Sequence, residues 1–326
     1  MIRVAIVGAT GLVGRMFLKI LEEKNLNIDE YVLFASSKSK GKKIDFLGKE
    51  YIVNELTESS FKDIYFDYAL FSAGSKVSEK YGKIAREAKT IVIDNGSYYR
   101  MDEDVPLVVP EVNKDDIFKN TGIIANPNCS TIGSVSILKA LEDYNIKRVV
   151  FSTYQAVSGA GVGGINDLTN TRKGNLPIKF KYNITDNCIP QIDTFLENRY
   201  TKEEMKMINE TRKILHKPNL LITSTCVRVP VLNCHSESIN IEFEKPFDLE
   251  EIINKLNKYE NIKVVDDISN EVYPLNEIAN SHDEIFVGRI RRDYSVPHGI
   301  NVWAVSDNVR KGAAANAISI LALLVN

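Results

Sequence analysis

A glycine-rich turn near the N-terminus constrains the fold of this 326-residue chain more than any other feature. Gly8, Gly11 and Gly14 follow a short apolar run at 4–7 and precede the segment 12–24, whose apolar residues recur with the period of an α-helix. The pattern predicts a buried strand, a tight turn and a helix whose N-terminal N–H groups bind a dinucleotide pyrophosphate. Alternatively, the glycines only let the helix pack closely on the strand.

Strand and helix patterns continue to alternate through the first third of the sequence. Short apolar runs rich in β-branched and aromatic residues lie at 31–35, 68–72 and 90–93, and a helical pattern covers 76–88. Such runs are typical of parallel strands buried on both faces. The repeated βαβ pattern predicts an α/β fold with a Rossmann-like doubly wound sheet, into which a hairpin at 42–55 is inserted.

The sequence changes character near residue 128. Beyond it, longer runs with clearer alternation predict an α+β domain with a mixed, largely antiparallel sheet and one covered face. The runs are 148–157, 220–229, 236–243, 286–290 and 301–305, with helical patterns at 131–143, 201–215 and 249–259. We therefore expect a first domain over 1–128, completed by an apolar C-terminal helix at 309–326, and a second domain over 129–308. Two domains also fit the length, because single cores stop growing at about 250–300 residues.

Charge and hydropathy exclude several functional classes. Lys plus Arg number 41 and Asp plus Glu 43, so the chain lacks the basic excess of a nucleic-acid-binding protein. The longest apolar stretch, 318–325, is much shorter than the roughly 18 residues of a membrane-spanning helix. The apolar start at 1–7 leads into the glycine turn and not into a signal-peptide cleavage site. We expect neither a nucleic-acid nor a membrane partner.

The cysteines are few and scattered, at 129, 188, 226 and 234. They form no CxxC pair and no dense disulfide framework, which favours a reducing cytoplasm. A zinc site built from Cys226, Cys234 and His235 would lack both the usual spacing and a fourth ligand, so we expect no metal.

The end of the predicted second strand indicates the type of dinucleotide. NAD sites usually place a carboxylate there, on the ribose 2′-hydroxyl. This chain instead carries Ser36, Lys38 and Ser39. Hydroxyl and ammonium groups suit a 2′-phosphate, so the sequence favours NADP, with a solvated basic loop as the alternative.

Cys129 has the local sequence of a reactive cysteine. It lies between Asn126-Pro-Asn128 and Ser130-Thr131, at the start of a predicted amphipathic helix whose capping residues are Asn, Ser and Thr. The partial positive charge at a helix N-terminus stabilises a thiolate, which attacks carbonyl carbon and acyl phosphates. Alternatively, Cys129 is a small buried hydrophobic residue. The other three cysteines lack this setting and are interpreted as structural.

An ordered set of motifs resembles the aspartate-β-semialdehyde dehydrogenase family almost from end to end. The motifs are GATGLVG at 8–14, FSAGS at 71–75, DNGSYYR at 94–100, VVPEVN at 108–113, NPNCST at 126–131, STYQAVSGAG at 152–161, PQID at 190–193, EEMKM at 203–207, CVRVPV at 226–231, HSES at 235–238, FVGRIRRD at 286–293 and VSDNVRKGAA at 305–314. Any one of them could arise by chance, whereas the ordered set is specific.

The resemblance implies a reaction and a cofactor. The reaction is the reversible, NADPH-dependent reductive dephosphorylation of L-4-aspartyl phosphate to L-aspartate 4-semialdehyde, in lysine (diaminopimelate), threonine and methionine biosynthesis. It implies that 1–128 binds NADP, that 129–308 is the catalytic and dimerisation domain, and that the protein is a cytoplasmic homodimer. By similarity, Cys129 forms a thioacyl intermediate, Gln155 orients the acyl group, and His235 is the general acid–base, with an unperturbed pKa of about 6.5.

The resemblance also implies ligands for the substrate. Arg228 is similar to the ligand of the α-carboxylate and Glu203 to the partner of the α-ammonium. Lys206 and Arg100 resemble the phosphate ligands, and Asn128 lies among the substrate-binding residues.

Read without the family, these residues have simpler interpretations. A capping box at Thr201–Glu204 places Glu203 and Lys206 on one helix face, where they could be a solvated ion pair. Arg228 falls on the polar side of an alternating strand and reads as a surface arginine. His235 opens a strand and reads as a structural histidine.

The resemblance also implies cofactor contacts at the positions of this sequence that match the family's cofactor-binding residues. They are the diphosphate turn (Gly8, Thr10, Gly11, Leu12, Val13 and Gly14), the 2′-phosphate loop (Ser36, Lys38 and Ser39), Ser158 and Gly159 near the nicotinamide half, and Asn308 at the carboxamide. Lys38 stands where the family commonly has Arg, which weakens planar recognition of the 2′-phosphate. The segment 170–187, near the family's subunit contact, is shorter than in many relatives.

Two other functions stay open on sequence grounds. N-acetylglutamyl-phosphate reductase shares the two-domain plan, but its substrate has an uncharged nitrogen that needs no carboxylate such as Glu203. A non-catalytic NADP-binding sensor would keep the glycine turn and would need neither Cys129 nor His235.

Overall fold

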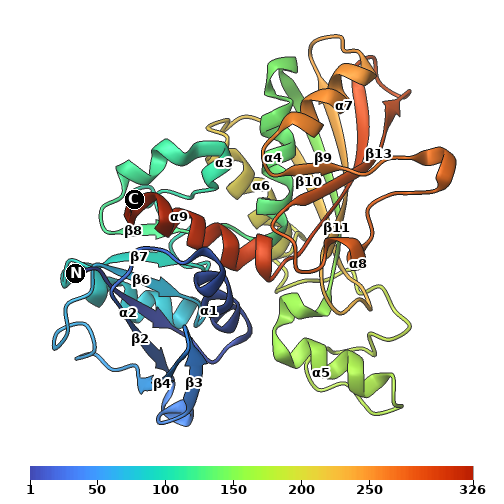
Figure 1. Cartoon of the computed structure of the whole chain (residues 1–326). Helices are drawn as coiled ribbons and strands as arrows, with labels where there is room; N and C mark the ends of the chain where they lie inside the picture. Colours follow the sequence, from blue (N-terminus) through green and yellow to red (C-terminus); the bar gives the residue numbers. More distant parts are fainter. Residues whose placement is uncertain (326) are drawn as a thin grey trace. The chain divides into compact units, whose positions relative to one another are not determined.

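The computed structural model describes residues 1–325 and divides into two compact units (Figure 1). The first unit consists of Met1–Asn128 together with the C-terminal segment from Ala313, and the second is Cys129–Gly312. Residue 326, which the sequence places at the end of the last helix, lies outside the described residues. Over residues 1–325, no helix has both the length and the apolar character needed to cross a membrane.

The first unit is built on a parallel sheet with the strand order β5-β2-β1-β6-β7-β8. The strands are β1 (Arg3–Val7), β2 (Glu30–Ala35), β5 (Asn54–Glu55), β6 (Tyr68–Phe71), β7 (Ile91–Asp94) and β8 (Ile123–Ala125). The order reverses direction at β1, so the crevice at the carboxyl end of β1 and β6 is where a doubly wound sheet binds its ligand. The inserted hairpin is present as β3 (Lys43–Phe46) and β4 (Lys49–Ile52).

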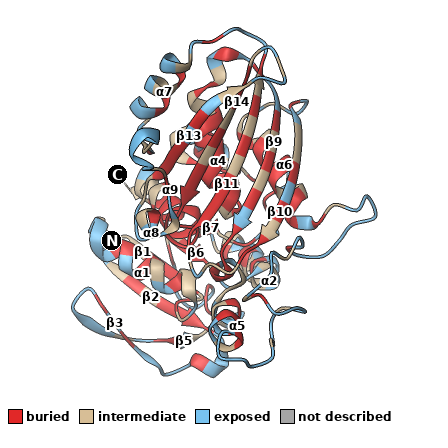
Figure 2. Ribbon diagram, turned by 90° about the vertical axis from the view of Figure 1, so that its right-hand side faces the viewer, coloured by how far each residue is buried: buried red, intermediate tan, exposed pale blue. Residues whose placement is uncertain are grey.

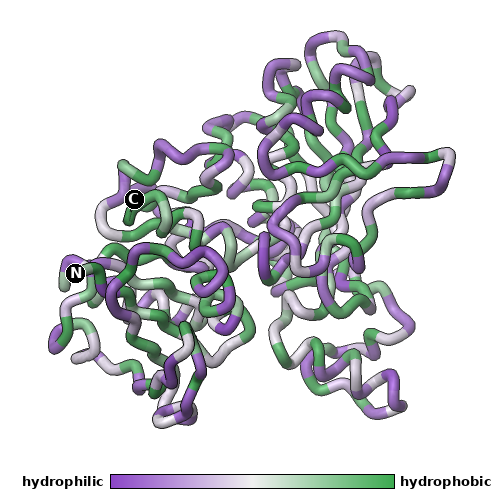
Figure 3. The backbone as a smooth tube through the Cα atoms, in the orientation of Figure 1, coloured by the Kyte–Doolittle hydropathy of each residue, from purple (hydrophilic) through white to green (hydrophobic). Residues whose placement is uncertain are grey.

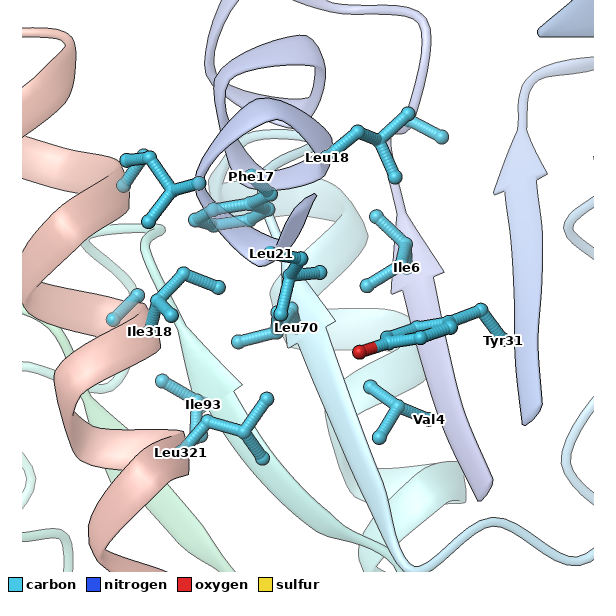
Figure 4. Close-up of a cluster of buried hydrophobic side chains, with 14 of the residues drawn as sticks. Val4, Ile6, Phe17, Leu18, Leu21, Tyr31, Leu70, Ile93, Ile318 and Leu321 are labelled. Atoms are coloured by element: carbon cyan, nitrogen blue, oxygen red, sulfur yellow. The ribbon is translucent and has the colours of Figure 1, made fainter. Parts of the chain in front are cut away.

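Three helices cover the strands of this unit: α1 (Leu12–Lys24), α2 (Ser75–Glu87) and α9 (Asn316–Val325), and a short α3 (Pro110–Asn113) lies between β7 and β8. Phe17 and Leu21 of α1 pack with Leu70, Ile93 and, from α9, Ile318 and Leu321 (Figure 4). The C-terminal helix thus completes the core of the first unit, although it is far away in sequence.

The second unit is built on a mixed sheet with the strand order β10-β9-β11-β14-β13-β12. Its strands are β9 (Ile146–Gln155), β10 (Leu221–Arg228), β11 (His235–Phe243), β12 (Ile262–Val264), β13 (Ile285–Asp293) and β14 (Gly299–Ser306). The pairs β9–β10 and β12–β13 are parallel and the others antiparallel. Its longer helices are α4 (Cys129–Ala140), α5 (Val162–Thr171), α6 (Lys202–Ile214) and α7 (Leu249–Lys258), with a short α8 (Asn276–Ala279).

Helices α4, α6 and α7 cover one face of this sheet (Figure 2). Figure 3 shows hydrophobic residues along the strands of both sheets and hydrophilic residues along the outer turns. Helix α4 is buried on nearly all sides, so the expectation of an amphipathic helix there is wrong. It lies between the sheet and its neighbours α6 and α7, and therefore has little solvent-facing surface.

Several elements depart from the sequence prediction. Strand β8, with three residues, is too short to give a pattern, and α5 follows a glycine-rich stretch that reads as a turn. The expected C-terminal helix begins with a π-helical turn at Arg310–Ala315 before continuing as α9.

Candidate active site

Four buried side chains form one row across four adjacent strands of the second unit. Arg228 of β10 pairs with Gln155 of β9. His235 opens β11 beside Gln155, because the next residue, Ser236, pairs with Tyr154. His235 in turn pairs with Ser306 of β14. Alternate residues of a strand share a face, so sheet register alone places the four side chains together under the covering helices.

Helix α4 begins above this row with Cys129, which is partly exposed, whereas Cys226 and Cys234 are buried. The Nε2 amide of Gln155 donates a hydrogen bond of 2.8 Å to the Oγ of Ser130, which ties the first turn of α4 to the row. A Cβ added to Gly312 would lie 2.8 Å from the Cβ of Cys129, so only glycine allows the chain to pass this close. Cys129 therefore lies at a helix N-terminus, where the peptide dipoles stabilise negative charge.

His235 is 1% exposed, and its surroundings define its protonation state. Its Nδ1 accepts a 3.1 Å hydrogen bond from the N–H of Ala156, so the proton of the neutral ring lies on Nε2. Nε2 is buried and has no hydrogen-bond partner among residues 1–325. Burial, and then the charge of Arg228, lower the pKa of His235 to about 3. The unperturbed pKa expected from sequence is therefore wrong, and the imidazole is neutral near pH 7.

Gly159 packs directly against His235 and Arg228. A Cβ at this position would lie 3.1 Å from Nε2 of His235 and 2.6 Å from Nη1 of Arg228, so only glycine allows this close approach. Since Nε2 is a donor without a partner among residues 1–325, it can bind an oxygen atom of a substrate.

Arg228 is 5% exposed, so the expectation that it lies on the polar, solvent-facing side of its strand is wrong. Ser224, Cys226 and Arg228 all point to the covered face, whereas Leu221 and Thr225 are exposed. Polar and apolar residues do alternate along β10, as the sequence indicates. At this end of the strand, however, the face covered by helices is the polar one, so Arg228 is buried and not exposed. Nη1 of Arg228 donates to the carbonyl of Ala156 at 2.6 Å, and burial lowers the pKa of the guanidinium.

Glu203 and Lys206 lie on one face of α6, and the predicted capping box at its start is present at Thr201 and Glu204. Glu203 is buried and accepts from Nε2 of Gln155 at 3.2 Å and from Nζ of Lys206 at 3.0 Å. Lys206 also donates to Asp193 at 3.1 Å. Burial lowers the pKa of Lys206, but the two carboxylates outweigh it, so the pKa is raised. The pair is not the solvated ion pair of the simpler interpretation.

A second polar network links Ser158 to Asn308, both of them buried. The amide of Asn308 and the hydroxyl of Ser158 are hydrogen-bonded, with Nδ2 3.0 Å from Oγ. Asn233 lies 3.0 Å from the same hydroxyl through Oδ1 and donates to Asp307 at 2.9 Å. Sequence reasoning missed Asn233, Asp307 and Asp193, although Asp307 and Asp193 lie within motifs that it quoted.

The glycine turn of the first unit has the geometry of an anion-binding site. Gly8 has φ 88°, and a Cβ on Gly14 would lie 2.1 Å from the carbonyl oxygen of Gly8, so helix and turn approach as only glycine permits. Gly11 is the N-cap of α1, and within residues 1–325 no side chain caps this helix. The N–H groups of the first turn, which include those of Leu12 and Val13, are thus available to a pyrophosphate.

The predicted 2′-phosphate loop lies beside this turn. The hydroxyl of Thr10 is 3.4 Å from the hydroxyl of Ser39, which is buried, whereas Ser36 and Lys38 are exposed. Hydroxyl and ammonium groups at the end of β2 fit the 2′-phosphate of NADP. Arg100 and Asn128 are buried in the same unit, and Nη2 of Arg100 donates to the carbonyl of Asn95 at 3.0 Å.

Two family models match the chain: "Semialdehyde dehydrogenase, NAD binding domain" over residues 3–120 and "Semialdehyde dehydrogenase, dimerisation domain" over residues 138–311. An aspartate-semialdehyde dehydrogenase of Aquifex aeolicus is 53% identical over 99% of this chain and 98% of the relative. One of Campylobacter jejuni is 49% identical over 98% of this chain and 96% of the relative. The chain belongs to the aspartate-semialdehyde dehydrogenase family.

Solved structures of aspartate-semialdehyde dehydrogenases agree. A Vibrio cholerae aspartate semialdehyde dehydrogenase II, solved in complex with ASA, has a TM-score of 0.95 and 44% identity, covering 100% of this chain and 98% of that chain. A Candida albicans aspartate semialdehyde dehydrogenase, solved with NADP, has a TM-score of 0.78 and 26% identity over 99% and 98% of the two chains. The expected α/β fold, family, NADP cofactor and phosphorylating dehydrogenase activity are confirmed.

The short segment after α5 is anchored by one carboxylate in this member of the aspartate-semialdehyde dehydrogenase family. Asp167 of α5 accepts from the backbone N–H groups of Ile178, Lys179 and Phe180 at 2.7 to 2.9 Å. Over residues 1–325, no three His, Cys, Asp or Glu side chains are grouped as they would be around a metal ion.

Proposed function

We propose that Cys129 is the nucleophile of this aspartate-semialdehyde dehydrogenase, and that the row of Arg228, Gln155 and His235 forms its catalytic site. In the reductive direction, the sulfur attacks the acyl carbon of aspartyl phosphate, the C–O bond to phosphate breaks, and a thioester forms. A reduced nicotinamide, when bound, would supply the hydride that converts this acyl group to the level of the aldehyde. The carbon–sulfur bond then breaks, which releases the semialdehyde and restores the sulfur anion.

His235 is proposed to stabilise the negative charge that develops on the substrate oxygen in these steps. Its Nε2–H is buried, unpartnered among the described residues, and packed against Gly159. It can donate a hydrogen bond to that oxygen and keeps its proton throughout, because loss of the proton from the neutral ring would leave an imidazolate. The unpartnered Nε2 atom, in the row that α4 covers with Cys129, is the observation that carries the proposal.

The remaining residues are proposed to recognise the charged groups of the substrate. The guanidinium of Arg228 suits the α-carboxylate, because its planar fork can bind a carboxylate through two hydrogen bonds. The buried carboxylate of Glu203 suits the α-ammonium, and Lys206, whose pKa is raised, keeps the positive charge that phosphate needs. Gln155 is proposed to orient the acyl group, and the family resemblance assigns Arg100 and Asn128 to substrate binding as well.

We also propose that the first unit, Met1–Asn128 with the C-terminal segment from Ala313, binds NADP. The turn Gly8–Gly14 and the loop with Ser36, Lys38 and Ser39 hold the phosphates. The family resemblance assigns Ser158, Gly159 and Asn308 to the nicotinamide half, and the hydrogen-bonded pair of Ser158 and Asn308 is consistent with a shared role. The four free thiols are consistent with work in the reducing cytoplasm.

A homodimer is proposed to form through the uncovered face of the second unit's sheet. Tyr154 on this face is 38% exposed and its ring lies 5.4 Å from that of Trp303, while Leu221 is 55% exposed. The dimerisation-domain model covers these strands. Sedimentation equilibrium of the wild type is expected to give a dimer and that of Tyr154→Glu a lower dimer fraction. A monomeric wild type at micromolar concentration would contradict the proposal.

The chemical step is tested by trapping the acyl-enzyme. Protein incubated with aspartyl phosphate and no NADPH is expected to gain one aspartyl group, which peptide mass spectrometry places on Cys129. Cys129→Ala is expected to gain no aspartyl group. It is also expected to lose the phosphate-dependent oxidation of the semialdehyde by NADP. Acylation elsewhere, or normal turnover by Cys129→Ala, would reject the nucleophile.

A further inference from the structure

Four polar side chains of the second unit form a chain of hydrogen bonds that begins at Asp307 and ends at Asn308. Nδ2 of Asn233 donates to Oδ2 of Asp307 at 2.9 Å, and Oδ1 of Asn233 lies 3.0 Å from the hydroxyl of Ser158. The same hydroxyl lies 3.0 Å from Nδ2 and 3.1 Å from Oδ1 of Asn308. We call these four residues the amide relay. The proposed function gives a role to Ser158 and Asn308 but none to Asp307 and Asn233.

The buried side chain of Asp307 accepts hydrogen bonds at both of its oxygens. Its Oδ1 accepts from the N–H groups of Val309 and Arg310 at 3.0 and 2.8 Å, and its Oδ2 accepts from the N–H of Ser281 at 2.9 Å. With Asn233 as the second donor to Oδ2, the lone pairs of both oxygens are occupied and none is left for a carboxyl proton. The carboxylate therefore holds the amide of Asn233 with its nitrogen toward Asp307 and its oxygen away from it.

Proton counting carries this orientation to Asn308. Because Oδ1 of Asn233 can only accept, it takes the single hydroxyl proton of Ser158. The oxygen of Ser158 then accepts from its other neighbour, where only Nδ2 of Asn308 has a proton to donate. The amide of Asn308 is thus held with its nitrogen donating to Ser158. Its Oδ1 has no other donor among residues 1–325 and is available as an acceptor.

We propose that Asp307 and Asn233 are positioning residues, which orient the amide of Asn308 so that its oxygen accepts from the carboxamide NH2 of the nicotinamide. This inference rests on the proposed contact between Asn308 and that carboxamide. A cofactor that carries an NH2 group at this position is favoured over one that does not. The amide relay is therefore a specificity device for the carboxamide.

The preference is measured by binding alone, with the 3-acetylpyridine analogue of NADP, in which a methyl group replaces the carboxamide NH2. Isothermal titration calorimetry of the full chain, without substrate, gives the Kd values for NADP and for the analogue. The wild type is expected to bind NADP at least about fivefold more tightly, the scale of one hydrogen bond. Asn233→Leu is similar in size but has no polar group, so the amide of Asn308 can turn. We expect this variant to lower the ratio of the two Kd values below about twofold.

Asn276→Leu is the matched control, because Asn276 contacts the same loop without belonging to the amide relay. Its Nδ2 donates to the backbone carbonyls of Asn233 and Cys234 at 3.3 and 2.8 Å, so the substitution loosens this loop. We expect it to weaken the binding of NADP and of the analogue by the same factor, which keeps the wild-type ratio. A purely structural role of Asn233 would give this same result in Asn233→Leu.

An exchange of the carboxylate and the amide tests the direction of the relay. In Asp307→Asn, the new amide keeps its oxygen toward the two backbone N–H groups at Oδ1, so its nitrogen faces Asn233. The amide of Asn233 then turns its nitrogen toward Ser158, and the ratio is expected to fall below about twofold. Addition of Asn233→Asp gives the new amide a carboxylate to donate to and gives Ser158 an acceptor again. This double variant is expected to restore a ratio above about threefold. Both variants lack the bond from the N–H of Ser281, so their difference reports the relay alone.

Three results would overturn the inference. They are a wild type without preference for NADP over the analogue, a wild-type ratio in Asn233→Leu, and a double variant with no higher ratio than Asp307→Asn. If Asn233→Leu does not fold, Asp307→Asn and the double variant decide the question. Failure of the proposed contact itself is distinguished by Asn308→Leu, which would then keep the wild-type ratio. If the contact is real and only the relay fails, Asn308→Leu loses the preference while Asn233→Leu keeps it.

Discussion

The neutral state of His235 follows from its burial and from the N–H of Ala156, which occupies its Nδ1 lone pair. Its pKa of about 3 lies below the ordinary value of about 6.5, so the unfolded chain binds a proton between these values and the folded protein does not. Stability therefore falls as pH falls from about 6.5 toward 3.

His235→Gln is expected to remove this part of the pH dependence. Between pH 7 and pH 5 the wild type should lose about 2 kcal/mol through this group, which the neutral amide avoids. Urea unfolding at both pH values measures the difference, with the exposed His282→Gln as the control. The same variant is expected to lower kcat about 10²- to 10⁴-fold. Equal pH dependence in wild type and variant would mean that the folded protein protonates His235.

Gly159→Ala is expected to damage the reaction more than the fold. Its added methyl would lie 2.6 Å from Arg228 and 3.1 Å from Nε2 of His235, against the two side chains proposed to bind the substrate. We expect kcat/KM for the semialdehyde to fall at least about tenfold, with a change in unfolding free energy of about 1–3 kcal/mol from overpacking. Gly163→Ala, whose methyl would make only an ordinary contact with Lys179, is the control. Wild-type kinetics in Gly159→Ala would place the substrate elsewhere.

Helix α5 and the segment after it depend on one carboxylate. Three N–H groups lower the pKa of Asp167 despite the opposing effect of burial. Because the folded pKa is below the unfolded value, this stabilisation is present at neutral pH and is lost as pH falls through the folded pKa.

Asp167→Ala is expected to loosen this element locally at neutral pH. Loss of charged hydrogen bonds, at about 1.5–3 kcal/mol each, should raise the hydrogen-exchange rates of the amides of Ile178, Lys179 and Phe180 by at least tenfold. Asp186→Ala, an exposed change in the same segment, is the control. Unchanged exchange at these three amides would show that the segment is held by its apolar contacts at Ile184 and Phe180.

Elements with a strong period were predicted well from sequence, and those that depend on tertiary context were not. Helix α1 and the strands β1 and β2 follow from local apolar patterns within a residue or two. The burial of α4 and the covered face of β10 could not be predicted, because alternation shows that two faces differ but not which one the helices cover. The row of Arg228, Gln155 and His235 depends on sheet register between distant strands, which no local pattern contains.

At the scale of the whole molecule, the chain has two units with separate cores, and the proposed function divides cofactor binding and chemistry between them. The glycine turn lies in the first unit and Cys129 opens the second. This division could be anticipated from the change of sequence character near residue 128. The return of the C-terminal helix to the first core follows from its apolar composition together with the need to bury it.

The division predicts that binding and chemistry can be lost independently. Cys129→Ala is expected to abolish turnover and to keep the Kd for NADPH within about twofold, since the phosphate-binding turn is untouched. Gly14→Ala places a methyl 2.1 Å from the carbonyl of Gly8, so it should weaken NADPH binding at least about tenfold. Its Cys129 should still be alkylated by iodoacetamide at the wild-type rate, because the second unit keeps its own core.

Both properties are measured on both variants: NADPH binding by fluorescence titration, and the state of residue 129 by peptide mass spectrometry after alkylation. If Gly14→Ala also changed the alkylation of Cys129, or Cys129→Ala also lost NADPH, the two units would be coupled in a way that separate cores do not explain.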